Sequence, residues 1–342
     1  MKEDNKDERH SVSVHENVSR DPTATGEFAV QVGETAPDEK RQFGCRGTEI
    51  STRNTRREIC QDQHHHHPLL SFDEIPGWYQ DNSYIRGGYR PVLQSARACF
   101  RSWTYVHNET MNIYTHLVPA AALLLAGVIY VSAHLRYRGG DAGVVVALLF
   151  AATACLGVSS AYHTLLCHSR KVETLWLRLD FVGILLLILG SFVSGIYVGF
   201  WCETLERNIY WSMIGTLAAV SIVIVLAPTF QGPRWRILRL LTFVCTGLSG
   251  LAPIAHGISM FGFSQMAKQS GLVYYLVEGA LFSTGAIVYA TRFPESLRPG
   301  TFDIYGASHQ IFHVLVVIAT VVHLAGVLDA LDYNHHHRQC SF

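Results

Sequence analysis

The sequence predicts an all-α membrane protein: a seven-transmembrane helix bundle with a cytoplasmic N-terminus and a disordered N-terminal tail. Three observations lead to this prediction. Seven stretches are apolar over about 20 residues, the length that a helix needs to cross a bilayer. Of the 54 charged residues, 30 lie in residues 1–101 and the other 24 are spread over residues 102–342. The basic residues that flank the apolar stretches also gather on one side of the membrane.

Residues 1–69 are expected to form a polar cytoplasmic tail. They are rich in Glu, Asp, Arg, Thr, Ser, Gln and Gly, and they show neither helical nor strand periodicity. Such a segment cannot bury enough apolar surface to offset the entropy of ordering, so we expect it to be disordered. The tail ends in the histidine run His64–His67, and a second run, His335–His337, lies near the C-terminus. Such runs can bind metals weakly, but a low-complexity linker is the simpler interpretation.

Residues 70–101 are expected to form a juxtamembrane interfacial segment. Aromatic and aliphatic residues stand beside arginines there, as at Trp78, Tyr79, Arg90 and Arg97. This mixture is typical of a short helix that lies in the membrane interface. A soluble subdomain is the alternative, but about thirty residues would be very few for one.

Residues 102–333 are expected to form the membrane domain, and residues 334–342 a short C-terminal tail. The connections between the apolar stretches are short, which favours one bundle over separate domains. Three prolines lie within spans or at their ends, where membrane helices tolerate them: Pro119, Pro228 and Pro253. The seven predicted spans are 112–134, 143–163, 178–200, 209–228, 237–257, 271–291 and 308–331.

The orientation follows from the Lys and Arg residues near the span ends. The side that carries the N-terminus has 12 of them and the opposite side has 5. Because cytoplasmic loops are enriched in basic residues, the N-terminus is expected in the cytoplasm and the C-terminus outside or in a lumen. The chain opens on a charged segment with no cleavable signal peptide. We therefore expect a multi-pass protein of the plasma membrane or an endomembrane.

Composition also excludes some classes of protein. A net charge of zero argues against a nucleic-acid binder, which would carry a basic patch. The eight cysteines are scattered and include no C-x-x-C pair, so nothing indicates a disulfide scaffold or a cysteine zinc finger.

Polar residues inside the spans gather at one depth. Odd spans enter from the cytoplasmic side and even spans return to it, so the start of an odd span lies level with the end of an even one. Ionisable groups are costly in a membrane and usually face a cavity or a partner. Four chain segments place such residues in the cytoplasmic leaflet: Glu109, Asn112 and His116 in span one, Ser159 and His163 in span two, Asp180 in span three, and His309 and His313 in span seven.

This set indicates a metal site. His163, His309 and His313 supply three imidazoles, and His309 and His313 have the i, i+4 spacing that lets both reach one ion. Three histidines with an open fourth position describe a catalytic Zn²⁺ site, in which bound water reaches a pKa of about 7. Asp180 is expected to hold or deprotonate that water, and Ser159 to hydrogen-bond the water or a substrate oxygen.

Structural roles compete with these assignments. For Asn112 and Ser159, hydrogen bonding between helices is an equal alternative to chemistry. Glu109 and His116 are expected to brace the site, with contact to a lipid headgroup as the alternative. Two loop residues just after His163 are rival ligands, although exposure in the loop is the simpler interpretation: Cys167 and His168. Outside the cluster, His256, Glu278 and His323 are interpreted as contacts between helices, with no partner assigned to Glu278.

Several motifs resemble the progestin and adipoQ receptor family, in particular its adiponectin-receptor-like and fungal Izh-type members, with haemolysin III proteins as more distant relatives. The motifs extend over roughly residues 70–331. They are Asp81-Asn82-x-Tyr84-Ile85 to Gly88-Tyr89-Arg90, His107-Asn-Glu-Thr-Met-Asn-Ile-Tyr-Thr-His116, Ser159-x-x-x-His163, Asp180-x-x-Gly183, Pro294-Glu295, Pro299-Gly300-x-Phe302-Asp303 and Ser308-His-Gln-Ile-Phe-His313.

The resemblance implies seven spans, a cytoplasmic N-terminus and a buried zinc ion. It places the zinc ligands on His163, His309 and His313, the partner of the zinc-bound water on Asp180 and the motif serine on Ser159. Members of the family have been linked to ceramidase-type amide hydrolysis, ligand reception, lipid signalling and zinc homeostasis.

Three functions remain for testing. The first is an intramembrane zinc hydrolase acting on a lipid amide such as ceramide, coupled to receptor signalling. The second is a non-catalytic receptor, with an extracellular protein ligand, or a zinc-homeostasis sensor, in which zinc is structural. A transporter is the weakest of the three, because the outer half of the membrane offers only Glu278 and His256 for a charged path.

Overall fold

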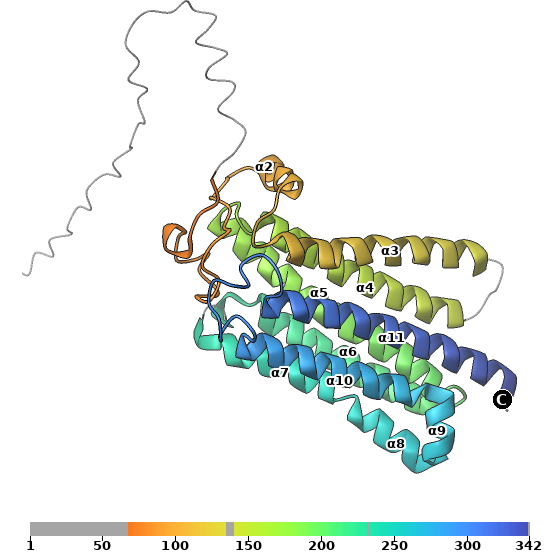
Figure 1. The fold of residues 1–342 in the computed structure, drawn as a ribbon. Coiled ribbons are helices and arrows are strands. Elements are labelled where there is room, and N and C mark those ends of the chain that lie inside the picture. The colour runs from red at the N-terminus through yellow and green to blue at the C-terminus, as the bar shows by residue number, and fades with distance from the viewer. Residues whose placement is uncertain (1–67, 135–139, 231–232, 341–342) are drawn as a thin grey trace, which may run out of the picture. The chain divides into compact units, whose positions relative to one another are not determined.

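Helices account for nearly all the regular structure in the computed structural model, which describes residues 68–134, 140–230 and 233–340. The tail that is predicted to be disordered, residues 1–69, lies outside the described residues except for its last two positions. The His64–His67 run also lies outside them. Seven helical spans of the described chain are long and apolar enough to cross a membrane, which confirms the predicted all-helical, seven-span bundle (Figure 1). The main helices are α2 (Ala96–Arg101), α3 (Thr110–His134), α4 (Gly140–Leu165), α5 (Arg170–Gly199), α6 (Thr204–Leu226), α7 (Arg236–Leu248), α8 (Leu251–Phe261), α9 (Phe263–Ser270), α10 (Leu272–Thr291) and α11 (Ser308–His337).

The last helix, α11, lies against most of the bundle. It packs along α10 and also contacts α3, α4, α5 and α9. The main apolar core joins α3, α4, α5 and α11, through residues such as Leu148, Leu156 and Val327. The helices that carry the predicted site are thus the ones that share the core.

Two glycines allow α4 and α5 to approach each other closely. A Cβ atom at Gly183 would lie 3.1 Å from the Cα of Cys155, and one at Gly190 would lie 2.6 Å from the Cβ of Ala151. Small residues at such positions are how membrane helices gain close packing. The contact sets the spacing between the helix that carries His163 and the helix that carries Asp180.

The fifth span consists of two helices where the sequence predicts one. α7 ends at Leu248 and α8 begins at Leu251, and together they form the single candidate span Ile237–Phe261. The break is explained by Pro253, which has no N–H to donate to the carbonyl of Ser249 and whose ring would clash with it in a continuous helix. The backbone N–H of Ala252 bonds that carbonyl instead, at 3.1 Å.

The seventh span is longer than predicted. α11 continues to His337, so the second histidine run and the start of the predicted C-terminal tail are helical. Polar contacts hold this extension: the amide nitrogen of Asn334 donates to the carbonyls of Val198 and Gln269, and His335 pairs with Asp141 at 2.8 Å.

A disulfide joins Cys202, in the turn between α5 and α6, to Cys340 after α11. These cysteines are 138 residues apart, so their spacing in the sequence carries no sign of the bond. Only the folding of α11 against α5 brings them together.

The juxtamembrane segment is mostly an irregular strap rather than a helix. It contains α2 and one turn of 3-10 helix, η1 (Phe72–Glu74), and a second turn, η2 (Ser102–Thr104), follows it directly. Backbone hydrogen bonds tie the strap to the turn after α4, from Leu93 to Cys167 and from Gln94 to His168, and its Gly88 carbonyl accepts from Asn108 just before α3. The strap therefore folds onto the helix ends where the predicted site lies.

Candidate metal centre

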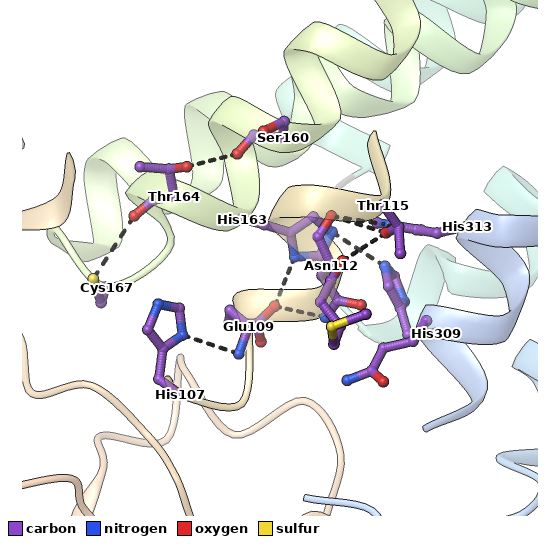
Figure 2. Close-up of polar contacts among 12 residues, drawn as sticks. His107, Glu109, Asn112, Thr115, Ser160, His163, Thr164, Cys167, His309 and His313 are labelled. Atoms are coloured by element: carbon purple, nitrogen blue, oxygen red, sulfur yellow. Dashed lines mark hydrogen bonds and ion pairs between the residues drawn. The ribbon is translucent and has the colours of Figure 1, made fainter. Parts of the chain in front are cut away.

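Three histidines converge at one end of the bundle. His163 lies in the last turn of α4, and His309 and His313 lie in the first two turns of α11. One ring nitrogen from each lies within 4.8 Å of the others, which makes them a candidate set of metal ligands among the described residues. Figure 2 shows the three histidines close together, with His163 on α4 and His309 and His313 on α11.

Hydrogen bonds assign the nitrogens of two of these rings. The Nδ1 of His163 lies 2.8 Å from a carboxylate oxygen of Glu109, and the Nδ1 of His313 lies 3.2 Å from the backbone carbonyl of Asn112. Both partners are acceptors, so each Nδ1 carries the proton and each Nε2 presents a lone pair. A metal-binding histidine in proteins is held in this way, by an acceptor on its other nitrogen.

The spacing of one nitrogen pair fits zinc. The Nε2 atoms of His163 and His309 are 3.2 Å apart. A tetrahedral zinc ion with bonds of 2.0–2.1 Å to nitrogen separates two ligand nitrogens by about 3.3–3.4 Å. Two imidazole nitrogens that face each other at this distance need a proton or a cation between them. The residues present therefore suit a Zn²⁺ ion held by three imidazoles.

Asp180 and Ser159 lie beside this set. Ser159 is buried in α4, one turn before His163, and Asp180 projects from the facing helix α5. The hydroxyl of Ser159 hydrogen-bonds the carboxylate of Asp180, and that carboxylate also interacts electrostatically with His163. The structure thus places Ser159 one helical turn before His163, with Asp180 as its partner on the neighbouring helix.

Glu109, Asn112 and His116 all contact the ligand histidines or their partners. The amide of Asn112 donates to Glu109 at 2.7 Å, and Glu109 in turn accepts from His163. The ring of His116 stacks on that of His313, with centroids 3.6 Å apart and an angle of 8° between the planes. His116 is buried and neither ring nitrogen has a hydrogen-bond partner among the described residues.

Comparison with known proteins places the chain in a family. The sequence model described as haemolysin-III related matches residues 104–324. The chain belongs to the progestin and adipoQ receptor family. It is 42% identical over 275 residues to the adiponectin receptor protein of Drosophila melanogaster, covering 80% of this chain and 62% of that protein.

Further relatives of this progestin and adipoQ receptor family member come from a nematode and a yeast. The progestin and adipoQ receptor-like protein 1 of Caenorhabditis elegans is 38% identical over 262 residues, or 76% of this chain and 60% of the relative. The ADIPOR-like receptor IZH2 of Saccharomyces cerevisiae is 40% identical over 273 residues, or 78% of this chain and 85% of the relative. The chain thus spans about 60% of the length of the two animal relatives.

Two charged residues that support the centre of this family member were missed as site residues. The guanidinium of Arg90 is fully buried and donates to the backbone carbonyls of His163 and Thr164 at 2.6 and 3.0 Å. Glu295, also fully buried, accepts from the backbone N–H of Ser308 at 2.8 Å, next to His309. Both residues belong to the family motifs quoted above, and these motifs were the sequence signal that could have identified them. They are absent from the predicted site because it was assembled from polar residues in or at the ends of the apolar spans.

The rival ligands are not part of the set. His168 bonds Ser169 at 3.1 Å, and Cys167 contacts Cys99. Cys167 is fully buried, contrary to the simpler interpretation of loop exposure.

A second polar group lies elsewhere in the bundle and gives Glu278 its missing partner. Glu278 on α10 bonds the Nδ1 of His323 on α11 at 2.8 Å, and the Nε2 of His323 lies 3.0 Å from the hydroxyl of Ser194 on α5. His256 bonds Tyr210 on α6 at 3.0 Å. These residues therefore form interhelix contacts, as the sequence predicts.

Proposed function

We propose that this family member is an intramembrane, zinc-dependent hydrolase of lipid amides of the ceramide type. The observation that most supports the proposal is the convergence of three imidazoles, a carboxylate and a serine at one end of the bundle. Such a set differs from a purely structural zinc site, which more often has four protein ligands that include cysteines.

The residues of the chain have separate roles in this proposal. His163, His309 and His313 would hold the ion, which when bound would polarise the amide carbonyl and acidify a water molecule. Asp180 would hold that water and accept its proton, and Ser159, which hydrogen-bonds the carboxylate, would orient it. A bond then forms between the water oxygen and the carbonyl carbon. The carbon–nitrogen bond breaks, and the proton leaves with the amine.

The location of the centre suits a lipid substrate. The ligands lie within the last turn of α4 and the first two turns of α11. The ends of membrane helices lie near the polar boundary of the bilayer, where the amide of a membrane lipid is also found. A substrate in the membrane can therefore present its amide at the depth of the histidines.

The test combines metal analysis with a ceramide hydrolysis assay on the purified full chain. We expect about one zinc per wild-type chain. His309→Ala should lose both the zinc and the turnover. Asp180→Asn should keep the zinc and lose turnover by about 100-fold or more. His256→Ala, which alters an exposed histidine away from the centre, should keep both. The proposal would be contradicted by wild-type protein without stoichiometric zinc, or by unaltered ceramide hydrolysis in Asp180→Asn.

The second candidate is a non-catalytic receptor or zinc-homeostasis sensor whose zinc is structural. The names of the animal relatives, an adiponectin receptor protein and a progestin and adipoQ receptor-like protein, favour it. On this reading an extracellular protein is the ligand, and zinc fixes α4 against α11. Removal of zinc should then lower the melting temperature, while neither wild type nor any variant hydrolyses ceramide.

The proposal places the N-terminus in the cytoplasm and the C-terminus outside the cell or in a lumen. The excess of basic residues on the N-terminal side supports this orientation. The disulfide between Cys202 and Cys340 supports it independently, because disulfides persist in extracellular and lumenal compartments and are rare in the cytosol. The membrane of residence would be the plasma membrane or an endomembrane.

A further inference from the structure

A sulfur–sulfur contact holds helix α2 against the bundle. Cys99 is the buried residue of α2, whereas Phe100 beside it is 46% exposed. The Sγ of Cys99 lies 3.7 Å from the Sγ of Cys167, in the turn between α4 and α5. Both cysteines are free thiols with 0% of their surface exposed. The short helix is therefore docked through one thiol on another.

A buried positive charge lies beside this pair. The guanidinium of Arg90 donates to the hydroxyl of Ser102 at 2.8 Å, and that hydroxyl donates to the carbonyl of Cys99. On the other side, Arg90 donates to the carbonyl of Thr164. The Sγ of Cys167 contacts the same carbonyl at 3.8 Å (Figure 2). Arg90 thus bridges the two segments that carry the cysteines, and its charge favours a thiolate there.

The two thiols differ in acidity. The hydrogen bond between the sulfurs lowers the pKa of Cys167, burial raises it, and Arg90 lowers it further, to a net value of about 7. The same hydrogen bond, together with burial, raises the pKa of Cys99. One sulfur is therefore suited to attack an oxidant and the other to resolve the product, as in other redox-active cysteine pairs.

We propose that Cys99 and Cys167 form a redox modification site that takes a peroxide and closes to a disulfide between α2 and the α4–α5 turn. The Cys167 thiolate attacks one peroxide oxygen, the O–O bond breaks, and the second oxygen leaves as water after taking a proton. The sulfur of Cys99 then attacks the sulfur of the resulting sulfenic acid. The S–O bond breaks, and the oxygen leaves as water with the proton of Cys99. Both thiols are oxidised, and one peroxide is reduced to two waters.

The geometry permits this closure. The sulfurs must approach from 3.7 Å to about 2.05 Å. Movement of α2 can supply the approach, because this six-residue helix has five residues that are exposed or only partly buried. Local opening of this short, largely exposed helix also admits a molecule as small as hydrogen peroxide. The site lies outside the membrane spans and does not depend on the proposed hydrolase activity.

The experiment uses the purified full chain treated with hydrogen peroxide. Remaining thiols are alkylated under denaturing conditions, and the protein is digested without reductant for mass spectrometry. We expect a peptide containing Cys99 joined to one containing Cys167, with both alkylation signals falling together and returning after dithiothreitol. Cys155, a thiol buried within α4, should stay alkylated. Full alkylation of Cys99 and Cys167 while the exposed Cys245 is oxidised would overturn the proposal.

Two variants separate this reaction from random thiol exchange. In Cys99→Ser, oxidation of Cys167 should stop at a sulfenic acid that dimedone traps, with no joined peptide. Cys245→Ser is the matched control and should give the joined peptide at the wild-type rate. Loss of the joined peptide in Cys245→Ser would contradict the proposal, because the product would then arise through the exposed thiol. The wild-type measurement stands alone if the Cys99→Ser variant does not fold.

Discussion

Among the individual residues, His163 is held from two directions. The carboxylate of Glu109 accepts from its ring, and the guanidinium of Arg90 donates to its backbone carbonyl. The first contact sets which nitrogen carries the proton, and the second satisfies a carbonyl in the last turn of α4 that has no partner within the helix. Together they fix the position of the lone pair that faces His309.

The contact between Glu109 and His163 leads to a prediction about metal affinity. In Glu109→Gln the amide still reaches the ring, but the negative charge that raises the basicity of the ligand is gone. We expect zinc affinity to fall by about 10–100-fold. Competition with a fluorescent chelator measures the change, and Glu206→Gln, near the opposite end of the bundle, serves as the control. An unaltered affinity would show that Glu109 only braces the helix.

Among the elements, α11 is capped at its N-terminus by a residue from another segment, Glu295. Both carboxylate oxygens of Glu295 bond Ser308, one through its backbone N–H and one through its hydroxyl, and Glu295 also accepts from the amide of Asn82 at 3.1 Å. A carboxylate at a helix N-terminus satisfies free N–H groups and interacts favourably with the helix dipole. Glu295 therefore joins the strap and the α10–α11 loop at the residue before His309.

The cap at α11 leads to a prediction about stability. Glu295→Gln keeps the size of the side chain but removes its charge, so one of its buried hydrogen bonds is lost or weakened. We expect a destabilisation of about 1–3 kcal/mol. It should appear as a lower melting temperature in detergent, together with weaker zinc binding through His309. Asp332→Asn, which alters an exposed carboxylate on the same helix, should leave both unchanged. Equal melting temperatures for Glu295→Gln and wild type would contradict the role of the cap.

At the scale of the whole molecule, the two ends of the bundle differ in their cysteine chemistry. Cys202 and Cys340 are bonded at one end, whereas Cys99 and Cys167 remain thiols at the other, although their sulfurs are in contact. The proposed orientation accounts for this difference, because it places the first end in an oxidising compartment and the second in the reducing cytosol. The basic residues predict the same direction from the sequence.

This agreement leads to a prediction about topology. With one tag at each terminus and the chain in sealed microsomes, protease added outside should remove the N-terminal tag and spare the C-terminal one. The reason is that the outer face of a microsome corresponds to the cytoplasm. Permeabilised microsomes, in which both tags should be lost, are the control. Protection of the N-terminal tag alone would reverse the proposed orientation.

The sequence by itself determined the parts of this protein that depend on local composition and spacing. Long apolar runs specify helical spans, because a helix satisfies every backbone hydrogen bond within one continuous segment in lipid. The alternation of span direction then puts Ser159, His163, Asp180, His309 and His313 at one depth, without any knowledge of which helices touch.

Only the tertiary structure decided which groups pair across long distances in the chain. Arg90 meets the carbonyl of His163, Glu295 caps α11, Glu278 meets His323, and Cys202 bonds Cys340 because helices far apart in sequence pack side by side. Hydrogen bonds and sulfur contacts act over a few ångströms and depend on the rotation of each helix about its axis. Hydropathy fixes where a helix crosses the membrane but not which face meets which neighbour, so these partners emerge only from the packed bundle.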